Sequence, residues 1–97
     1  RRALPMDAEL AGILAESSFN QKEYEYARRL FEEHARKTPL TPPGLYMLAV
    51  CYWEQKSTKA AAETFRKALD AGVTGPMRNE SERLLKLCDE RLAESAK

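Results

Sequence analysis

Few residues in this chain have the chemistry of a catalyst. His34 is the single histidine, and the run Glu32-Glu33-His34 does not have the spacing of metal ligands. A catalytic triad requires further partners for such a histidine, and the sequence does not identify them. The common phosphate-binding, dinucleotide-binding, serine-hydrolase and zinc-protease motifs are missing. We therefore predict that the protein is not an enzyme and uses no cofactor or metal.

The two cysteines are the other chemically reactive side chains. Cys51 and Cys88 lie far apart within helical patterns and have no CxxC spacing. We expect two buried free thiols rather than a disulfide. This expectation favours a reducing compartment such as the cytoplasm, although a bacterial periplasm stays open, so the localisation is unknown.

Composition and charge limit the classes of partner. The 97 residues are 43% apolar and 32% charged, which is typical of one small globular domain. Sixteen basic and fifteen acidic residues give a net charge of +1, so no electrostatic argument favours nucleic acid. No apolar run approaches the ~20 residues that span a bilayer. We expect neither nucleic-acid binding nor direct membrane insertion. The missing initiator Met indicates a fragment of a longer protein.

Apolar periodicity predicts an all-α chain of five helices. Thr41 is a candidate N-cap for the third helix, and Gly72 is placed to end the fourth. Residues 1–5 form a lead-in, and one domain covers residues 6–97. The predicted helices are 6–19, 22–37, 42–55, 57–71 and 77–95.

The stretch from Leu45 to Leu69 is predicted to form one antiparallel helix pair. Ala61 and Phe65 in its second helix are preceded by Ala27 and Phe31 at an interval of 34 residues. A helix pair that recurs at this interval is typical of a helical repeat array.

The chain resembles a tetratricopeptide repeat (TPR) domain. The second repeat matches the family pattern as Leu45-x₂-Leu48-Ala49-x₂-Tyr52 followed by Ala61-x₃-Phe65, and the first as Ala11-x₂-Leu14-Ala15, Ala27-x₃-Phe31 and Pro39. Neither turn within a repeat contains glycine. The resemblance implies a right-handed α–α superhelix of five antiparallel helices. Its parts would be repeat one at about 8–41, repeat two at about 42–75 and a capping helix at about 77–95.

In TPR domains the first helix of each pair lines a concave groove. The resemblance therefore implies that partner contacts come from the helices 6–19, 42–55 and 77–95. The implied groove residues are Glu9, Gly12, Ile13, Glu16, Phe19, Asn20, Tyr46, Val50, Trp53, Glu54, Asn79, Glu82, Arg83 and Lys86. We select Tyr46, Val50, Trp53, Glu16, Phe19, Arg83 and Lys86 as candidate partner-binding residues.

Tyr46, Val50 and Trp53 follow one another at helical spacing on a face separate from the expected core face. Three explanations stay open: a groove for a peptide, burial beneath the last helix, and a contact with a second copy. A clamp for chaperone C-terminal tails is not expected, because Gly12, Glu16 and Met47 stand where that clamp has Lys and Asn.

We expect a non-enzymatic scaffold that binds a peptide or helix of a partner protein. The alternatives are a self-associating solenoid segment and a small TPR-type secretion chaperone.

Overall fold

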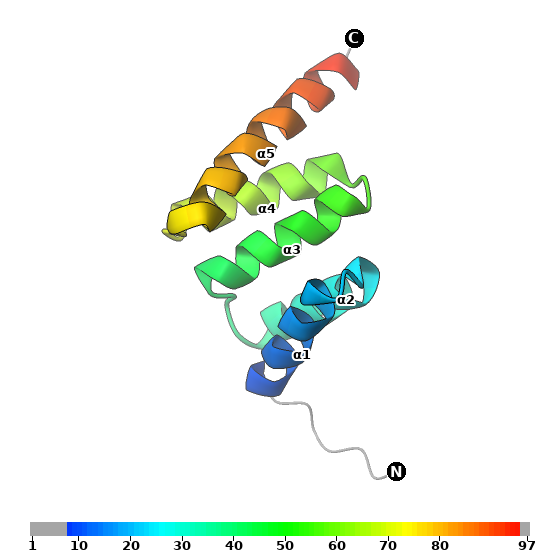
Figure 1. Ribbon diagram of the computed structural model, residues 1–97, viewed down its shortest axis with the longest axis vertical. Coiled ribbons are helices and arrows are strands. Elements are labelled where there is room, and N and C mark those ends of the chain that lie inside the picture. Colours follow the sequence, from blue (N-terminus) through cyan, green and yellow to red (C-terminus); the bar gives the residue numbers. More distant parts are fainter. Residues whose placement is uncertain (1–7, 96–97) are drawn as a thin grey trace.

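The computed structural model describes the backbone of residues 8–95 and the side chains of residues 13–94. This part of the chain is all-α, as predicted, and contains no strand (Figure 1). The helix ends fall within two residues of the predicted ones, except for the expected start at 6–7, which lies outside the described residues. The helices are α1 (Ala8–Asn20), α2 (Tyr24–Lys37), α3 (Pro42–Glu54), α4 (Thr58–Asp70) and α5 (Gly75–Ser95).

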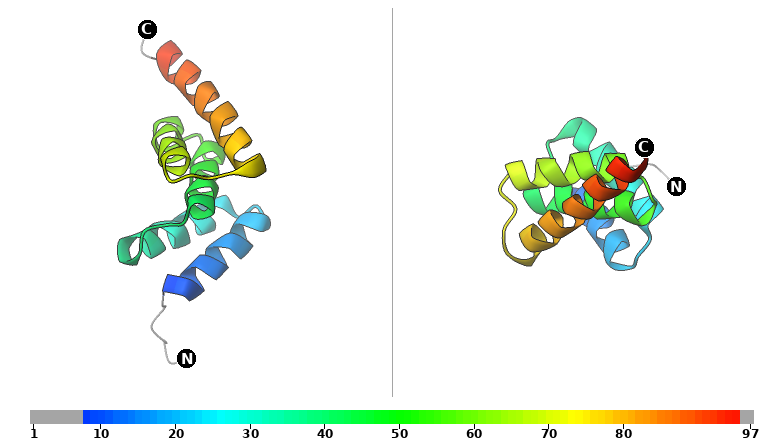
Figure 2. Two further views of the ribbon diagram at one scale, coloured as in Figure 1. Left: turned by 90° about the vertical axis from the view of Figure 1, so that its left-hand side faces the viewer. Right: turned by 90° about the horizontal axis from the view of Figure 1, so that it is seen from above.

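The helices stack in chain order along the long axis of the molecule (Figures 1 and 2). α1 packs against α2 and α3 packs against α4, each pair joined by a tight turn. α2 contacts α3 and α4 contacts α5, while α1 and α5 each also contact α3. The predicted pairing within Leu45–Leu69 is therefore confirmed, and α3 is the helix that contacts every other one.

The 34-residue interval recurs in the backbone of the two tight turns. Lys22 and Lys56 both adopt left-handed conformations, with φ of 65° and 63°. The following residues, Glu23 and Ser57, have φ of −89° and −88°, each with a ψ of 71°. The two turns are therefore built alike, although the residues after the two lysines differ.

Capping explains where α3 begins and α4 ends. The Thr41 hydroxyl accepts a hydrogen bond from the backbone N–H of Gly44 at 3.2 Å, as predicted for an N-cap. Gly72 follows α4 with a φ of 95°, a conformation that favours glycine. Gly75, with a φ of 67°, begins α5 two residues before the predicted start, and this turn brings α5 back over α4.

The core consists of two clusters that meet on α3. The first joins α1, α2 and α3, and the second joins α3, α4 and α5. Alanines related by the 34-residue interval are fully buried in both clusters. Their small side chains let the paired helices approach closely. These pairs are Ala15 with Ala49 and Ala27 with Ala61. Cys51 and Cys88 are buried free thiols, as expected.

The left-handed turn lysines give a stability prediction. A side chain in this conformation costs about 1 kcal/mol, which glycine relieves at some cost in unfolded-state entropy. Lys56→Gly should therefore raise the free energy of unfolding by roughly 0.5 kcal/mol. The control Lys67→Gly, within α4, should lower it by about 1 kcal/mol. Urea denaturation measures both, and an equal loss in the two variants contradicts the prediction.

Candidate partner-binding site

Aromatic rings from α1, α2 and α3 pack against one another at one surface. The ring of Phe19, at the end of α1, lies 5.9 Å from that of Tyr24 and 6.5 Å from that of Tyr46. The ring of Tyr46 lies 6.5 Å from the buried ring of Phe65. Phe19, Tyr24 and Tyr46 are each partly exposed. These three side chains, called the aromatic row below, join α1, α2 and α3 at one surface.

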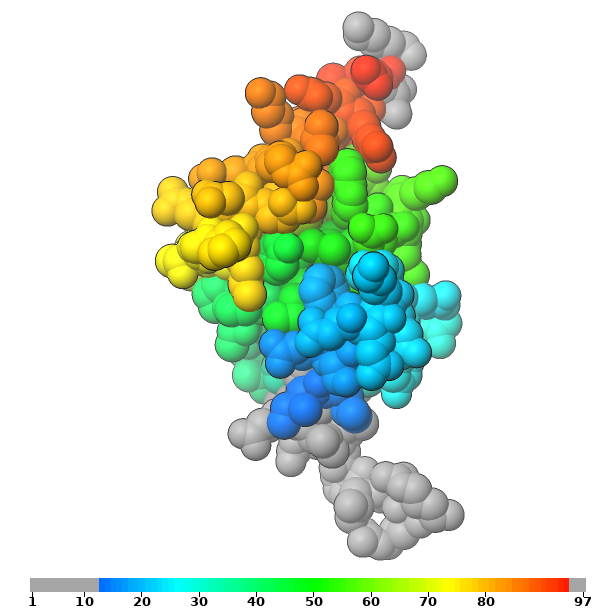
Figure 3. Space-filling view, in the orientation of Figure 1, coloured from blue at the N-terminus to red at the C-terminus, as the bar shows by residue number. Residues whose placement is uncertain are grey.

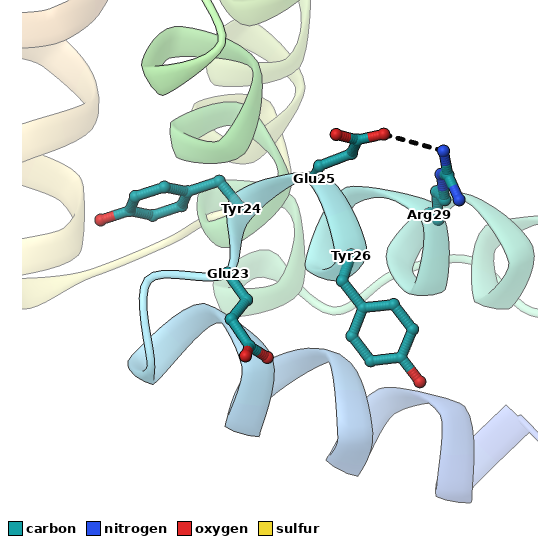
Figure 4. A pocket seen from close by; sticks show the side chains of 5 residues that line it. All are labelled: Glu23, Tyr24, Glu25, Tyr26 and Arg29. Carbon is teal, nitrogen blue, oxygen red and sulfur yellow. Dashed lines mark hydrogen bonds and ion pairs between the residues drawn. The ribbon is translucent and has the colours of Figure 1, made fainter.

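Tyr24 was not among the candidate partner-binding residues. The direction of its side chain explains why it belongs to the same surface. Figure 4 shows Tyr24 and Tyr26 leaving the first turn of α2 on different sides, with Tyr26 directed over α1 and Tyr24 directed away from it. Tyr26 is 53% exposed, whereas Tyr24 packs edge-on against Phe19. Helical spacing places both tyrosines on α2, but only the packing of α1 distinguishes their roles.

Val50 occupies the middle of the predicted binding face and is only 8% exposed. It lies in the cluster that contains Leu84 and Cys88 of α5. Because α5 packs over this part of α3, Val50 belongs to the core rather than to a surface that a partner contacts. This corrects its selection as a partner-binding residue.

Trp53 lies one helical turn beyond Val50 and stays partly exposed. The guanidinium carbon of Arg91, on α5, lies 4.5 Å from the centroid of the Trp53 ring. This is a cation–π contact. Arg91 was not predicted as a site residue, because its place over Trp53 results from the course of α5 and has no signal in the sequence.

Charged groups border the aromatic row. Arg83 on α5 donates hydrogen bonds to Glu80 at 2.6 and 3.2 Å. Burial raises the pKa of Tyr46, the neighbouring Glu80 raises it further, and Arg83 lowers it. Burial and then Glu54 raise the pKa of Tyr24. Both phenols therefore stay protonated near neutral pH and can donate hydrogen bonds to a partner.

The remaining candidates do not all join this surface. Glu16 is exposed on α1, whereas Lys86 lines a separate depression with Leu69 of α4. Arg83 and Lys86 were expected to border one groove. The structure instead leaves Arg83 near Tyr46 and Lys86 near α4. Glu9 and Gly12, from the wider groove set, have side chains outside the described residues.

The candidate partner-binding site therefore consists of Phe19, Tyr24, Tyr46 and Trp53, bordered by Glu54, Glu80, Arg83 and Arg91. Glu16 is exposed on α1, three residues before Phe19. Figure 3 shows the face on which α1, α3 and α5 adjoin, with the green atoms of α3 between blue α1 and yellow α5. Aromatic side chains with a charged border are typical of protein recognition surfaces.

Other kinds of site find no support among the described residues. No group of His, Cys, Asp and Glu in this part of the chain is arranged to hold a metal ion. None of the described helices combines the length and apolar character needed to cross a membrane. No protein-family model matches the sequence, and comparisons with curated proteins and with solved structures find no significant match either.

The contact between Arg91 and Trp53 can be tested by fluorescence, since Trp53 is the single tryptophan. Arg91→Ala should expose the indole, shift its emission to longer wavelength and lower the free energy of unfolding by about 0.5–1 kcal/mol. Arg78→Ala serves as the control, because Arg78 on α5 forms an exposed ion pair with Glu82. Equal spectra for both variants and the wild type contradict the contact.

The buried thiols report whether α5 stays docked over α3. Burial raises the pKa of the Cys51 thiol to about 12 from an ordinary 9.0, and burial also raises that of Cys88. At pH 8 both thiols should react with a disulfide reagent at least about 100-fold more slowly than in the unfolded chain, because only rare opening exposes them. Single variants Cys51→Ala and Cys88→Ala assign the two rates. Fast labelling of Cys88 alone contradicts stable docking of α5.

The raised pKa of Cys51 predicts that the free energy of unfolding depends on pH. Between pH 9 and about 12 the unfolded chain loses the Cys51 proton that the folded protein retains. Stability supplied by this thiol is therefore complete below pH 9 and falls as the pH rises through this window. Cys51→Ala should remove that part of the decline in urea denaturation.

Proposed function

We propose that this protein is a non-enzymatic, TPR-like interaction module that binds a peptide or helix of a partner protein through the candidate partner-binding site. The observation that carries the proposal is the partial exposure of Tyr46 and Trp53 on the α1–α3–α5 face, where α5 covers Val50 between them. Large aromatic side chains at a surface are the residues that most often dominate protein-binding energy.

The repeat geometry supports the TPR-like part of the proposal. The two turns have matching backbone angles at an interval of 34 residues, and equivalent alanines are buried in both pairs. The first helix of each pair lies beside the next first helix, since α1 and α5 both contact α3. A right-handed superhelix with its groove on these helices is the arrangement that we infer from this pattern.

The site favours a partner segment with an apolar anchor and hydrogen-bonding groups. The aromatic row supplies rigid rings, and the protonated phenols of Tyr24 and Tyr46 supply donors. The border has both signs of charge, because Glu54 acts on Tyr24, the Arg83–Glu80 pair acts on Tyr46 and Arg91 lies over Trp53. An amphipathic helix or an extended peptide with mixed charge fits such a surface.

Peptides selected from a random display library on the immobilised protein provide a ligand for the test. Trp53→Ala and Tyr46→Ala should each weaken the selected peptide at least about tenfold, or about 1.4 kcal/mol, as measured by fluorescence anisotropy of the labelled peptide. Circular dichroism verifies that the variants fold.

Tyr26→Ala is the matched control, because Tyr26 is an exposed tyrosine that points away from the aromatic row. It should bind the selected peptide like the wild type. If Tyr26→Ala abolishes binding while folded Trp53→Ala and Tyr46→Ala retain it, the site assignment is wrong.

A further inference from the structure

A second surface lies between α4 and α5, apart from the aromatic row. Leu69 of α4 and Leu85 and Ala93 of α5 supply apolar lining to an open depression. Charged side chains of α5 complete it, among them Glu82, Lys86 and Asp89. Leu69 and Leu85 are only partly buried here, because among the described helices only α3 and α4 contact α5.

The side chains along the outer face of α5 form a regular stripe. Glu82, Lys86, Asp89 and Ala93 are separated by four, three and four residues. This alternation keeps them on one line of the helix surface, as in the seam of a coiled coil. The line is flanked by Leu85 on the side nearest Leu69 of α4. The stripe, called the α5 seam below, is therefore a surface of the right shape to pack against another helix.

The charges of the α5 seam are complementary to those of the α5 seam of a second copy that runs in the opposite direction. When two α5 helices pair antiparallel about a two-fold axis between Leu87 and Cys88, Lys86 lies opposite Asp89 of the other copy. Glu82 then lies opposite Ala93, so the four stripe residues place no like charges opposite one another. Glu90, which also lines the depression, lies outside the stripe. The symmetry repeats the Lys86–Asp89 contact twice, and it places the apolar flanks of both copies on the same side.

The individual charges are available for this pairing. Asp89 uses one carboxylate oxygen to accept from Arg66 at 2.8 Å, and its side chain is 49% exposed. Lys86 makes no ion pair within the described part of the chain. Exposed ion pairs contribute little affinity, so the charges set register and orientation while burial of Leu69, Leu85 and Ala93 drives association.

We propose that the α4–α5 depression is the interface of a homodimer, whose occupant is the α5 seam of a second copy of this chain. The interface is independent of the proposed peptide site, because neither Tyr46 nor Trp53 lines the depression. The two sites remain accessible together, and a dimer would present two peptide sites to a partner that carries two binding segments.

Sedimentation equilibrium of the full chain from about 1 µM to about 1 mM tests the association. The wild type should show a concentration-dependent doubling of mass. Leu85→Glu should raise the dissociation constant at least about tenfold, since it places a carboxylate in the apolar lining. A wild type that stays monomeric over this whole range overturns the proposal and leaves the depression to a different partner.

Charge reversal distinguishes this seam from any other dimer contact. Lys86→Asp alone places Asp opposite Asp, and Asp89→Lys alone places Lys opposite Lys, so each variant should dimerise at least about threefold more weakly than the wild type. An equimolar mixture of the two should recover a heterodimer, because every facing pair is again of opposite charge. Wild-type affinity in both single variants, or a mixture that associates no more tightly than either variant alone, overturns the antiparallel seam.

Three control variants separate the interface from folding and from peptide binding. Arg66→Ala removes the intrachain partner of Asp89 without changing the seam, and it should still dimerise. Lys67→Asp reverses an exposed charge on α4 outside the depression and should also dimerise. Trp53→Ala should keep the dimer even where it loses the peptide. Loss of the dimer in folded Lys67→Asp places the contact elsewhere and contradicts the proposal.

Discussion

Close packing of α3 against α4 is the contact on which the rest of the structure depends. Ala49 and Ala61 are fully buried between them, and Phe65 is the largest fully buried side chain among the described residues. Because alanine has no bulk beyond Cβ, the two backbones approach closely enough for one phenylalanine ring to fill the space. The Phe65 ring also packs against the Tyr46 ring, with 6.5 Å between the ring centroids. The candidate partner-binding site therefore rests directly on this packing.

Polar contacts fix how the first helix pair sits on the second. The Tyr52 hydroxyl donates to Glu32 at 2.5 Å, and Arg28 donates to Gln55 at 2.9 Å and to Glu32 at 3.0 Å. The bonds from Tyr52 to Glu32 and from Arg28 to Gln55 join α2 to the C-terminal end of α3, whereas the Arg28–Glu32 bond lies within α2 and orients both side chains. They lie beside the apolar cluster of Phe31 and Cys51. Directional bonds at the edge of a non-directional apolar contact favour one rotation of the two pairs. That rotation brings Phe19 and Tyr24 to Tyr46.

α5 gives the molecule two different surfaces. Its inner side buries Val50 with Leu84 and Cys88, and Ser81 is fully buried there as a small residue that permits close approach. One flank places Arg83 and Arg91 beside Tyr46 and Trp53, which creates a charged border. The outer side carries the α5 seam over Leu69 of α4. α5 thus borders the peptide site that we propose and supplies the dimer interface that we propose.

The sequence by itself determined the five helices, the α3–α4 pairing, the Thr41 cap and the free buried cysteines, because each depends on local periodicity or residue type. It also placed Tyr46 and Trp53 on a surface beside the core. The tertiary structure decided the rest. In the folded protein Val50 lies in the core, Lys86 lines the α4–α5 depression, and Tyr24 and Arg91 belong to the candidate partner-binding site. These placements follow from the course of α5 and the rotation of the first helix pair. Both depend on contacts between residues that are far apart in the chain. Helical spacing fixes which side of its own helix a residue occupies, but only packing fixes what that side meets.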